Sequence, residues 1–107
     1  MSNHNLNLPN DIAHYSFWKS IVVLPFVKSL YLLGSRARGD ARAKSDIDIA
    51  VNCPKASFQQ WEQVLDIIDD ADTLLGIDIV QYDELSDAVF KRKIDESKAV
   101  IYENGSA

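Results

Sequence analysis

The chain has 107 residues, 47% of them hydrophobic, and its 16 acidic and 11 basic side chains give a formal net charge of −5. This length and composition predict one domain, residues 1–107, with one modest hydrophobic core. The acidic balance excludes a general nucleic-acid-binding protein, because binding to a phosphate backbone needs a basic surface.

The first half of the chain predicts one helix and two strands. Residues 1–9 are polar, and we expect them to be frayed. A helix is predicted from residue 10 or 11 to about residue 23, because apolar residues recur there at helical spacing: Ile12, Tyr15, Trp18 and Val22. The apolar run at 26–33 predicts a buried strand that stops at Gly34, and the alternating stretch at 45–53 predicts a second strand.

The second half predicts two helices and two strands. Ser57 and Gln60 form a capping-box pattern before a helix at 58–74. A strand is predicted at 77–83 and a short last strand at 99–103. Between them we expect a helix at about 84–97, with these residues facing inward: Leu85, Val89, Phe90 and Ile94. The alternation predicts an α/β (α+β) fold, a mixed sheet of three to four strands with helices packed on it.

Signals for export and for membrane insertion are absent from the sequence. The polar start, MSNHNLNLPN, lacks the build of a signal peptide, and no apolar run is long enough to span a bilayer. The single cysteine, Cys53, excludes an internal disulfide. We therefore expect a soluble cytoplasmic protein that does not associate with membranes.

Three aspartates lie in predicted strands. Asp46 and Asp48 alternate with isoleucines in SDIDIAV, and Asp78 lies in a second Ile-Asp-Ile triplet. Because side chains alternate across a strand, all three share one face if the strands are neighbours, roughly 4.8 Å apart. Carboxylates that close repel one another unless a cation lies between them. Oxygen ligands select Mg²⁺ or Mn²⁺, and an i, i+2 pair can hold two ions about 4 Å apart.

The loop before these aspartates is basic and glycine-containing. Residues 34–45 hold four cationic side chains against one acid, Asp40, which suits a small anion such as a nucleoside triphosphate. Gly34 and Ser35 follow a strand directly, where backbone amides can hold a phosphate. Arg36 and Arg38 are suited to bidentate phosphate contact. The Walker pattern is absent, because Asp40 stands where it requires lysine.

These residues together resemble a known signature. Gly34-Ser35, ten further residues, Asp46-x-Asp48 and a later strand aspartate, Asp78, are similar to the pattern of the DNA polymerase beta nucleotidyltransferase superfamily. The string GSRARGDARAKSDIDIAV is most similar to the minimal nucleotidyltransferases, the MNT or MntA-like proteins. The resemblance runs from about residue 26 to residue 102 and implies a fold like the polymerase beta palm.

The resemblance also implies roles for the site residues. Asp46 and Asp48 would bind the two metal ions that hold the triphosphate, and Asp78 would complete one metal site and help activate the attacking hydroxyl. Gly34 and Ser35 would hold the β- and γ-phosphates. The nearby arginines match family positions close to the phosphates, without individual roles: Arg36 and Arg38.

The implied reaction transfers a nucleoside monophosphate, AMP from ATP, to a hydroxyl and releases pyrophosphate. The similar proteins are antitoxins encoded beside a HEPN-domain toxin, which they neutralise by attaching AMP to a tyrosine or by binding alone. Two alternatives stay open: a non-catalytic antitoxin, and a small acidic domain whose aspartates form a solvated patch. The identity of the acceptor and homo-oligomerisation also stay open.

Overall fold

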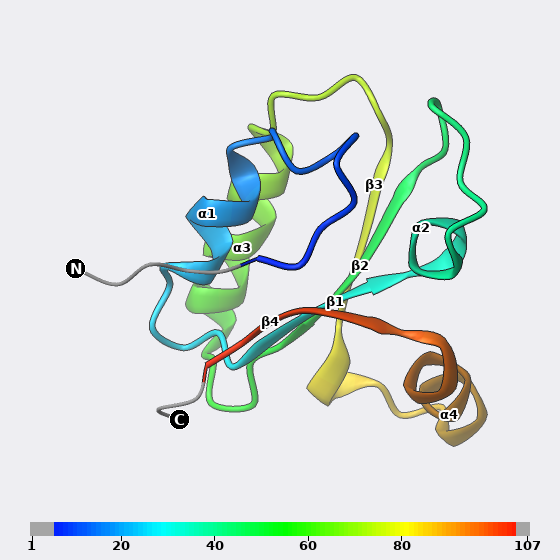
Figure 1. The fold of residues 1–107 in the computed structure, drawn as a ribbon. Helices are drawn as coiled ribbons and strands as arrows, with labels where there is room; N and C mark the ends of the chain where they lie inside the picture. Colours follow the sequence, from blue (N-terminus) through cyan, green and yellow to red (C-terminus); the bar gives the residue numbers. More distant parts are fainter. Residues whose placement is uncertain (1–5, 105–107) are drawn as a thin grey trace.

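The structure, a computed structural model, describes residues 6–104. Helices and strands alternate along most of the chain (Figure 1) in this order: α1 Phe17–Val22, β1 Ser29–Leu33, α2 Gly34–Arg38, β2 Ile47–Asn52, α3 Phe58–Asp69, β3 Ile77–Gln81, the 3₁₀ turn η1 Tyr82–Glu84, α4 Ala88–Ser97 and β4 Ala99–Glu103. Among these residues, no helix is long and apolar enough to cross a bilayer.

The strands form one mixed sheet in the order β3-β2-β1-β4. β1 pairs antiparallel with both β2 and β4, whereas β2 and β3 are parallel. The parallel pair follows from the connection through α3, because parallel neighbours need a crossover rather than a hairpin. The predicted fold class, a mixed sheet of three to four strands with packed helices, is confirmed.

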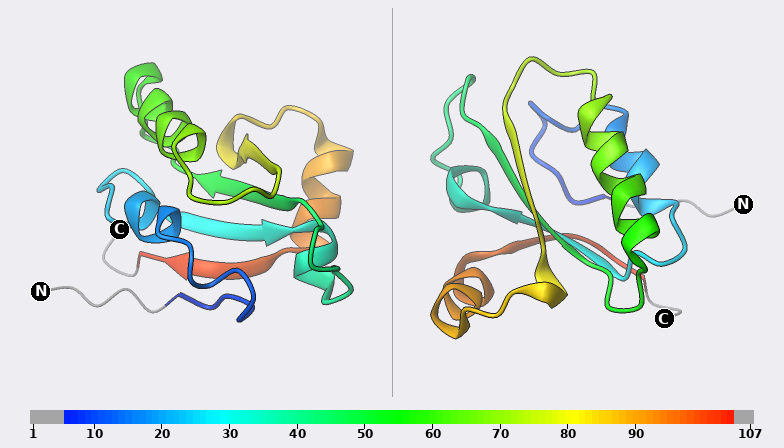
Figure 2. Two further views of the ribbon diagram at one scale, coloured as in Figure 1. Left: turned by 90° about the horizontal axis from the view of Figure 1, so that it is seen from above. Right: turned by 180° about the vertical axis from the view of Figure 1, so that it is seen from behind.

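The hydrophobic core lies between the sheet and the helices α1 and α3. Leu30 and Leu32 of β1 and Ile47 and Ile49 of β2 face these helices and are 0–1% exposed. Figure 2 shows α4 on the opposite side of the sheet, with α2 beside it at the end of β1. The aspartates alternate with the core isoleucines, so the sheet turns them toward the side that carries α2 and α4.

The N-terminal segment differs from its prediction. Residues 10–14 form turns, and the helix begins only at Phe17. The Trp18 indole donates a hydrogen bond to the carbonyl of Ile12 at 2.8 Å, which holds the turn in a non-helical form and buries Ile12. Of the residues predicted to be frayed, 1–5 lie outside the described residues, whereas Leu6 and Leu8 pack on the core. The prediction of fraying is wrong for residues 6–9.

The helix α3 begins as predicted and ends early. Ser57 accepts a hydrogen bond from the Gln60 amide at 3.1 Å, and the Gln60 side chain accepts one from the Ser57 amide at 2.8 Å. This confirms the capping box. The helix ends at Asp69 instead of residue 74. The sequence there, DDADT, consists mostly of weak helix formers, and its negative charges oppose the helix dipole at a C-terminus.

The helix predicted at 84–97 is shorter in the structure, where it spans Ala88–Ser97, and fewer of its side chains face inward than predicted. It begins at Ala88, because the Asp87 carboxylate caps the amides of Val89 and Phe90 at 3.0 and 3.1 Å. Ile94 is buried, but Val89 and Phe90 are 57% and 43% exposed. The expectation that both face the core is wrong, because α4 covers only part of the sheet.

Candidate active site

Asp48 and Asp78 are neighbours across the parallel strands β2 and β3. The two residues are register partners, as are Ile47 with Ile77 and Ile49 with Ile79. The repeated Ile-Asp-Ile triplet therefore puts both aspartates side by side on one face, as predicted. The two carboxylates lie close enough for the charge of Asp78 to act on Asp48.

The electrostatics of this pair are unfavourable for a second negative charge. Partial burial raises the pKa of Asp48 above its ordinary value. The hydrogen bond with Asp78 and the charges of Asp78 and Asp46 raise this pKa further, and the Arg38 charge opposes them. A pair of carboxylates that resists full ionisation without a counter-charge is a donor set that suits a hard divalent cation.

Asp46 lies at the entrance to β2 and is held close to Gly76. A Cβ atom added to Gly76 would come within 2.6 Å of the Asp46 Oδ1 atom, so only glycine fits there without a shift. The amide of Ile47 donates to the Gly76 carbonyl at 2.8 Å, which continues the pairing of the two strands up to this point. Asp46 thus sits one step beyond Asp48, near enough for its charge to act on that group.

Two of the predicted metal ligands lie together, but the described residues do not form a complete metal-binding site. Within residues 6–104, no three His, Cys, Asp or Glu side chains converge closely enough to hold an ion as they lie. The two carboxylates in contact, Asp48 and Asp78, offer oxygen donors alone, and these fit Mg²⁺ or Mn²⁺ rather than zinc.

Gly34 begins α2 directly beside the Asp48 carboxylate. Its φ angle is +65°, and a Cβ atom at this position would lie 2.5 Å from the Asp48 Oδ2 atom. Both facts require glycine. The loop that follows is a short helix, α2, which contains Ser35 in its first turn and ends at Gly39 with φ +88°. The backbone after β1 thus passes against the Asp48 carboxylate, and the phosphate-holding role of this turn stays a prediction.

The structure separates the two arginines of this loop. The Arg36 side chain is 1% exposed and forms an ion pair with Asp11 at 2.8 Å. It also donates to three backbone carbonyls of the segment that leads into β2, those of Arg42, Ala43 and Ser45, at 3.0 to 3.4 Å. Arg36 therefore fixes the segment before Asp46. Its contacts favour this structural role over the phosphate contact that we predicted.

Arg38 is the exposed member of the pair. Its side chain is 57% exposed and lies 3.3 Å from the carboxylate of Asp40. Arg38 also lines the cleft that contains the aspartates, and its charge acts on Asp48. A flexible cation at the edge of a carboxylate site matches the predicted phosphate-contacting role, which stays a prediction.

A cleft of about 330 Å³, here called the α4 cleft, lies between α4, the end of β1 and the neighbouring strands. Its apolar walls come from five residues: Leu33, Ile49, Val80, Phe90 and Ile94. Its polar lining comes from the carboxylate pair, two cations and a serine: Asp48, Asp78, Arg38, Lys93 and Ser97. The α4 residues were missed by sequence reasoning, because Phe90 and Ile94 were assigned to the core. The one available signal was the cationic run Lys91-Arg92-Lys93.

A cluster of side chains on the sheet side of α4 holds the helix in place. The Tyr82 hydroxyl donates to Asp95 at 2.5 Å, and Lys98 pairs with the same carboxylate at 2.9 Å. The Tyr82 ring meets the Tyr31 ring edge-on at 5.2 Å, and Lys98 lies 4.7 Å from the centre of the Tyr31 ring. This cluster connects η1, β1 and α4, and so fixes one wall of the α4 cleft.

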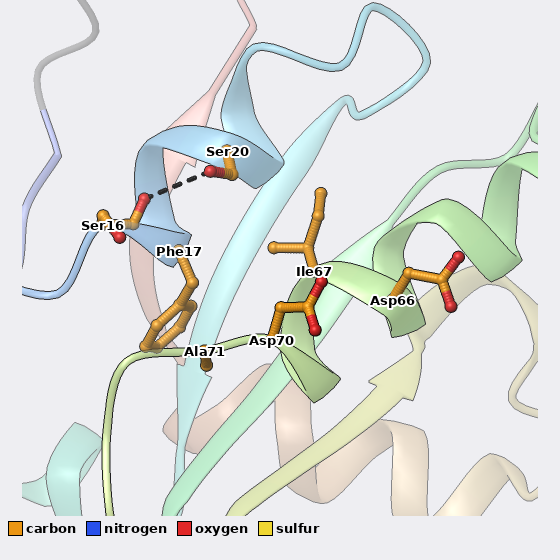
Figure 3. A pocket seen from close by; sticks show the side chains of 7 residues that line it. All are labelled: Ser16, Phe17, Ser20, Asp66, Ile67, Asp70 and Ala71. Carbon is orange, nitrogen blue, oxygen red and sulfur yellow. Dashed lines mark hydrogen bonds between the residues drawn. The ribbon is translucent and has the colours of Figure 1, made fainter.

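A second hollow, of about 250 Å³, lies between α1 and α3 (Figure 3). Its polar lining is Ser16, Ser20, Asp66 and Asp70. It is on the core-helix side of the sheet, away from the three predicted aspartates. We place the candidate active site at the α4 cleft, because only there do the carboxylate pair and the glycine turn come together.

Comparison with known proteins identifies the family of this chain. Residues 19–107 match the family described as "Polymerase beta, Nucleotidyltransferase". The chain belongs to the polymerase beta nucleotidyltransferase family. A Methanocaldococcus jannaschii relative, named "Putative protein adenylyltransferase MJ1379", is 32% identical over 72 residues, which cover 65% of this chain and 72% of that protein. This chain is therefore an enzyme of the nucleotidyltransferase class, and the resemblance predicted from the sequence is confirmed. Such enzymes generally use divalent metal ions.

Two solved structures share the nucleotidyltransferase fold. One, from Sulfolobus solfataricus and described as a "putative nucleotidyltransferase", has a TM-score of 0.55 at 22% identity and covers 82% of this chain and 75% of its own. The other is a chain of a toxin-antitoxin structure with AMP-PNP, with a TM-score of 0.58 at 23% identity over 85% of this chain and 76% of its own. Both confirm the fold predicted from the resemblance.

Proposed function

We propose that this nucleotidyltransferase moves AMP from ATP to a protein hydroxyl in a Mg²⁺-dependent reaction, and that it serves as an antitoxin. The observation that carries the proposal is the placement of Asp48 and Asp78 as register partners next to Gly34, in the lining of the α4 cleft. Two ionised carboxylates this close repel each other, and a divalent cation bound together with the nucleotide phosphates would remove this repulsion.

Each residue of the site has a proposed part in the reaction. Asp46, Asp48 and Asp78 would hold the metal ions, which would neutralise phosphate charge. Gly34 and Ser35 offer backbone amides and a hydroxyl to the β- and γ-phosphates. Arg38 reaches the triphosphate from the rim of the cleft.

The transfer step forms one bond and breaks one. The acceptor oxygen attacks the α-phosphorus of ATP, the bond from that phosphorus to the bridging oxygen breaks, and pyrophosphate leaves. Asp78 accepts the proton that the hydroxyl loses, as a positioned general base does. The products are the AMP ester of the acceptor and pyrophosphate.

The proposed acceptor is a tyrosine of a HEPN-type toxin. The adenylyltransferase relative supports AMP as the group transferred, and the toxin-antitoxin neighbour with AMP-PNP supports a toxin partner and an adenine nucleotide. The HEPN identity and the tyrosine come from the resemblance of GSRARGDARAKSDIDIAV to minimal nucleotidyltransferases.

The test is nucleotide binding and AMP transfer by Asp48→Asn, compared with Asp69→Asn as a control on the exposed side of α3. We expect calorimetry to show Mg²⁺-dependent ATP binding by the wild type and by Asp69→Asn. Asp48→Asn should lose at least about a hundredfold in transfer rate, as expected when a metal-holding carboxylate is removed. Wild-type protein that neither binds ATP with Mg²⁺ nor transfers AMP would refute the proposal.

A non-catalytic antitoxin is the second candidate function. Phe58 on α3 is 72% exposed and Leu74 after α3 is fully exposed, so large apolar side chains lie outside the α4 cleft and could contact a partner. This candidate predicts that Asp48→Asn still neutralises the toxin in a growth assay. If Asp48→Asn binds the toxin but fails to neutralise it, catalysis carries the function.

A further inference from the structure

We infer that the α4 cleft receives the acceptor and not the nucleotide base, and that it is shaped for a phenolic side chain. The inference rests on the proposed function and adds a substrate subsite to it. The cleft is about 330 Å³ in volume, near the lower end of the range for small-molecule sites, so it has room for one ring-sized group.

The position of the cleft relative to the carboxylates favours the acceptor. Asp48 and Asp78 line it, whereas Ser35 and Asp46 do not, and it meets the glycine turn only at Gly34 and Arg38. In phosphoryl transfer, the attacking and leaving oxygens lie roughly in line on opposite sides of the phosphorus. With the triphosphate along α2, the attacking hydroxyl enters from the Asp78 side, where the cleft opens.

The chemistry of the walls selects the kind of hydroxyl. Val80 and Phe90 enclose apolar space on the way to Asp78, together with Leu33 and Ile94. A short serine or threonine side chain would leave these walls in contact with water. A tyrosine side chain places its ring against them and its hydroxyl at the carboxylates, because it combines an apolar body with a polar tip.

Phe90 is an aromatic residue of the cleft lining whose ring is left partly exposed to solvent. It is 43% exposed, although it lines the cleft and the neighbouring Ile94 is only 4% exposed. An aromatic ring held at the mouth of a pocket can stack on an incoming ring, a contact worth about 0.5–1.5 kcal/mol beyond its buried area. Phe90 is therefore the predicted determinant of acceptor affinity.

The probe for the test is N-acetyl-tyrosinamide, with N-acetyl-serinamide as the comparison. Binding is followed by NMR through the methyl signals of Val80 and Ile94, in nucleotide-free protein and with saturating Mg²⁺–AMP-PNP. The variants are Phe90→Ala and Phe90→Leu. The matched control is Val89→Ala, an exposed residue of the same helix that does not line the cleft.

The tyrosine probe should shift both methyl signals, and the serine probe should not. Phe90→Ala should raise the dissociation constant of the tyrosine probe about tenfold, with Phe90→Leu between it and wild type, because an aromatic contact of about 1.4 kcal/mol is lost. Val89→Ala should leave this constant unchanged. ATP affinity should stay within about twofold of wild type in every variant, because the base does not occupy the cleft.

Two results would overturn the inference. One is that AMP-PNP alone moves the Val80 and Ile94 signals while Phe90→Ala weakens ATP binding tenfold, which assigns the cleft to the base. The other is that the tyrosine probe leaves the signals unmoved in the wild type. The nucleotide-free titration separates these failures from failure of the proposed function, which would show as absent Mg²⁺-dependent ATP binding in the wild type.

Discussion

At the scale of single residues, Arg36 and Arg38 show that two arginines close together in the sequence can have different structural roles. Both lie in the same short helix, and nothing in the local sequence distinguishes their roles. The direction of each side chain depends on tertiary neighbours: Arg36 points toward Asp11, 25 residues away, and Arg38 toward the cleft. By contrast, the placement of Asp48 beside Asp78 was predictable, because two copies of Ile-Asp-Ile fix register and face together.

The burial of Arg36 predicts a large stability difference between the two arginines. Arg36→Ala should lower the free energy of unfolding by about 2–4 kcal/mol, because it removes a buried charged donor and leaves three carbonyls to find new partners. Arg38→Ala should change it by less than about 0.5 kcal/mol, as expected for an exposed side chain. Urea denaturation followed by circular dichroism measures both. Equal losses of unfolding free energy in the two variants would contradict the structural role assigned to Arg36.

At the scale of elements, strands were easier to predict than helix ends. The four strands come from apolar or alternating runs, and their existence follows from local pattern alone. The start of α1 depends on the bond from Trp18 to the Ile12 carbonyl, and the inward face of α4 depends on how far the sheet extends beneath it. Neither is a property of the segment itself. The wall of the α4 cleft was missed for the same reason.

The contact that holds α4 gives a pH prediction. The hydrogen bond to Asp95 is the first cause that raises the pKa of Tyr82 to about 12. The folded protein therefore holds this proton more tightly than the unfolded chain does. The resulting stability is fully present below the ordinary tyrosine pKa near 10 and is lost as the pH rises through about 12.

A spectrophotometric titration at alkaline pH, with Tyr82→Phe subtracted from the wild type, measures this pKa directly. Asp95→Asn should lower it toward the ordinary value, and Glu96→Gln, on the exposed side of α4, should leave it at about 12. A Tyr82 pKa that does not respond to Asp95→Asn would show that the carboxylate does not hold the hydroxyl.

At the scale of the whole molecule, charge is separated along the chain. Residues 56–90 contain nine acidic side chains and no lysine or arginine, whereas most of the cations stand in the loop at 36–44 and in or next to α4. Both cationic segments lie at the side of the sheet that holds the candidate active site, since α2 contacts α4. An acidic protein thereby has a positive region beside the candidate active site, which suits the phosphates of the proposed nucleotide substrate.

This arrangement predicts that nucleotide and metal stabilise the fold together. A ligand at one hundred times its dissociation constant adds about 2.7 kcal/mol to the free energy of unfolding. For a domain of this size, we expect Mg²⁺–ATP to raise the melting temperature by roughly 10 °C. ATP with excess EDTA should give a much smaller shift, and Asp48→Asn should give none. A wild-type melt that is the same with and without Mg²⁺–ATP would contradict the assigned site.

The ion pair between Asp11 and Arg36 also matters for how the protein is handled. Through Arg36, the segment before α1 is connected to the carbonyls that lead into Asp46, so the N-terminal segment supports the candidate active site. A purification tag or a fusion partner that pulls on residues 6–11 would disturb the carboxylates without touching them. The activity measured on protein tagged at that end would then differ from the activity of the untagged enzyme.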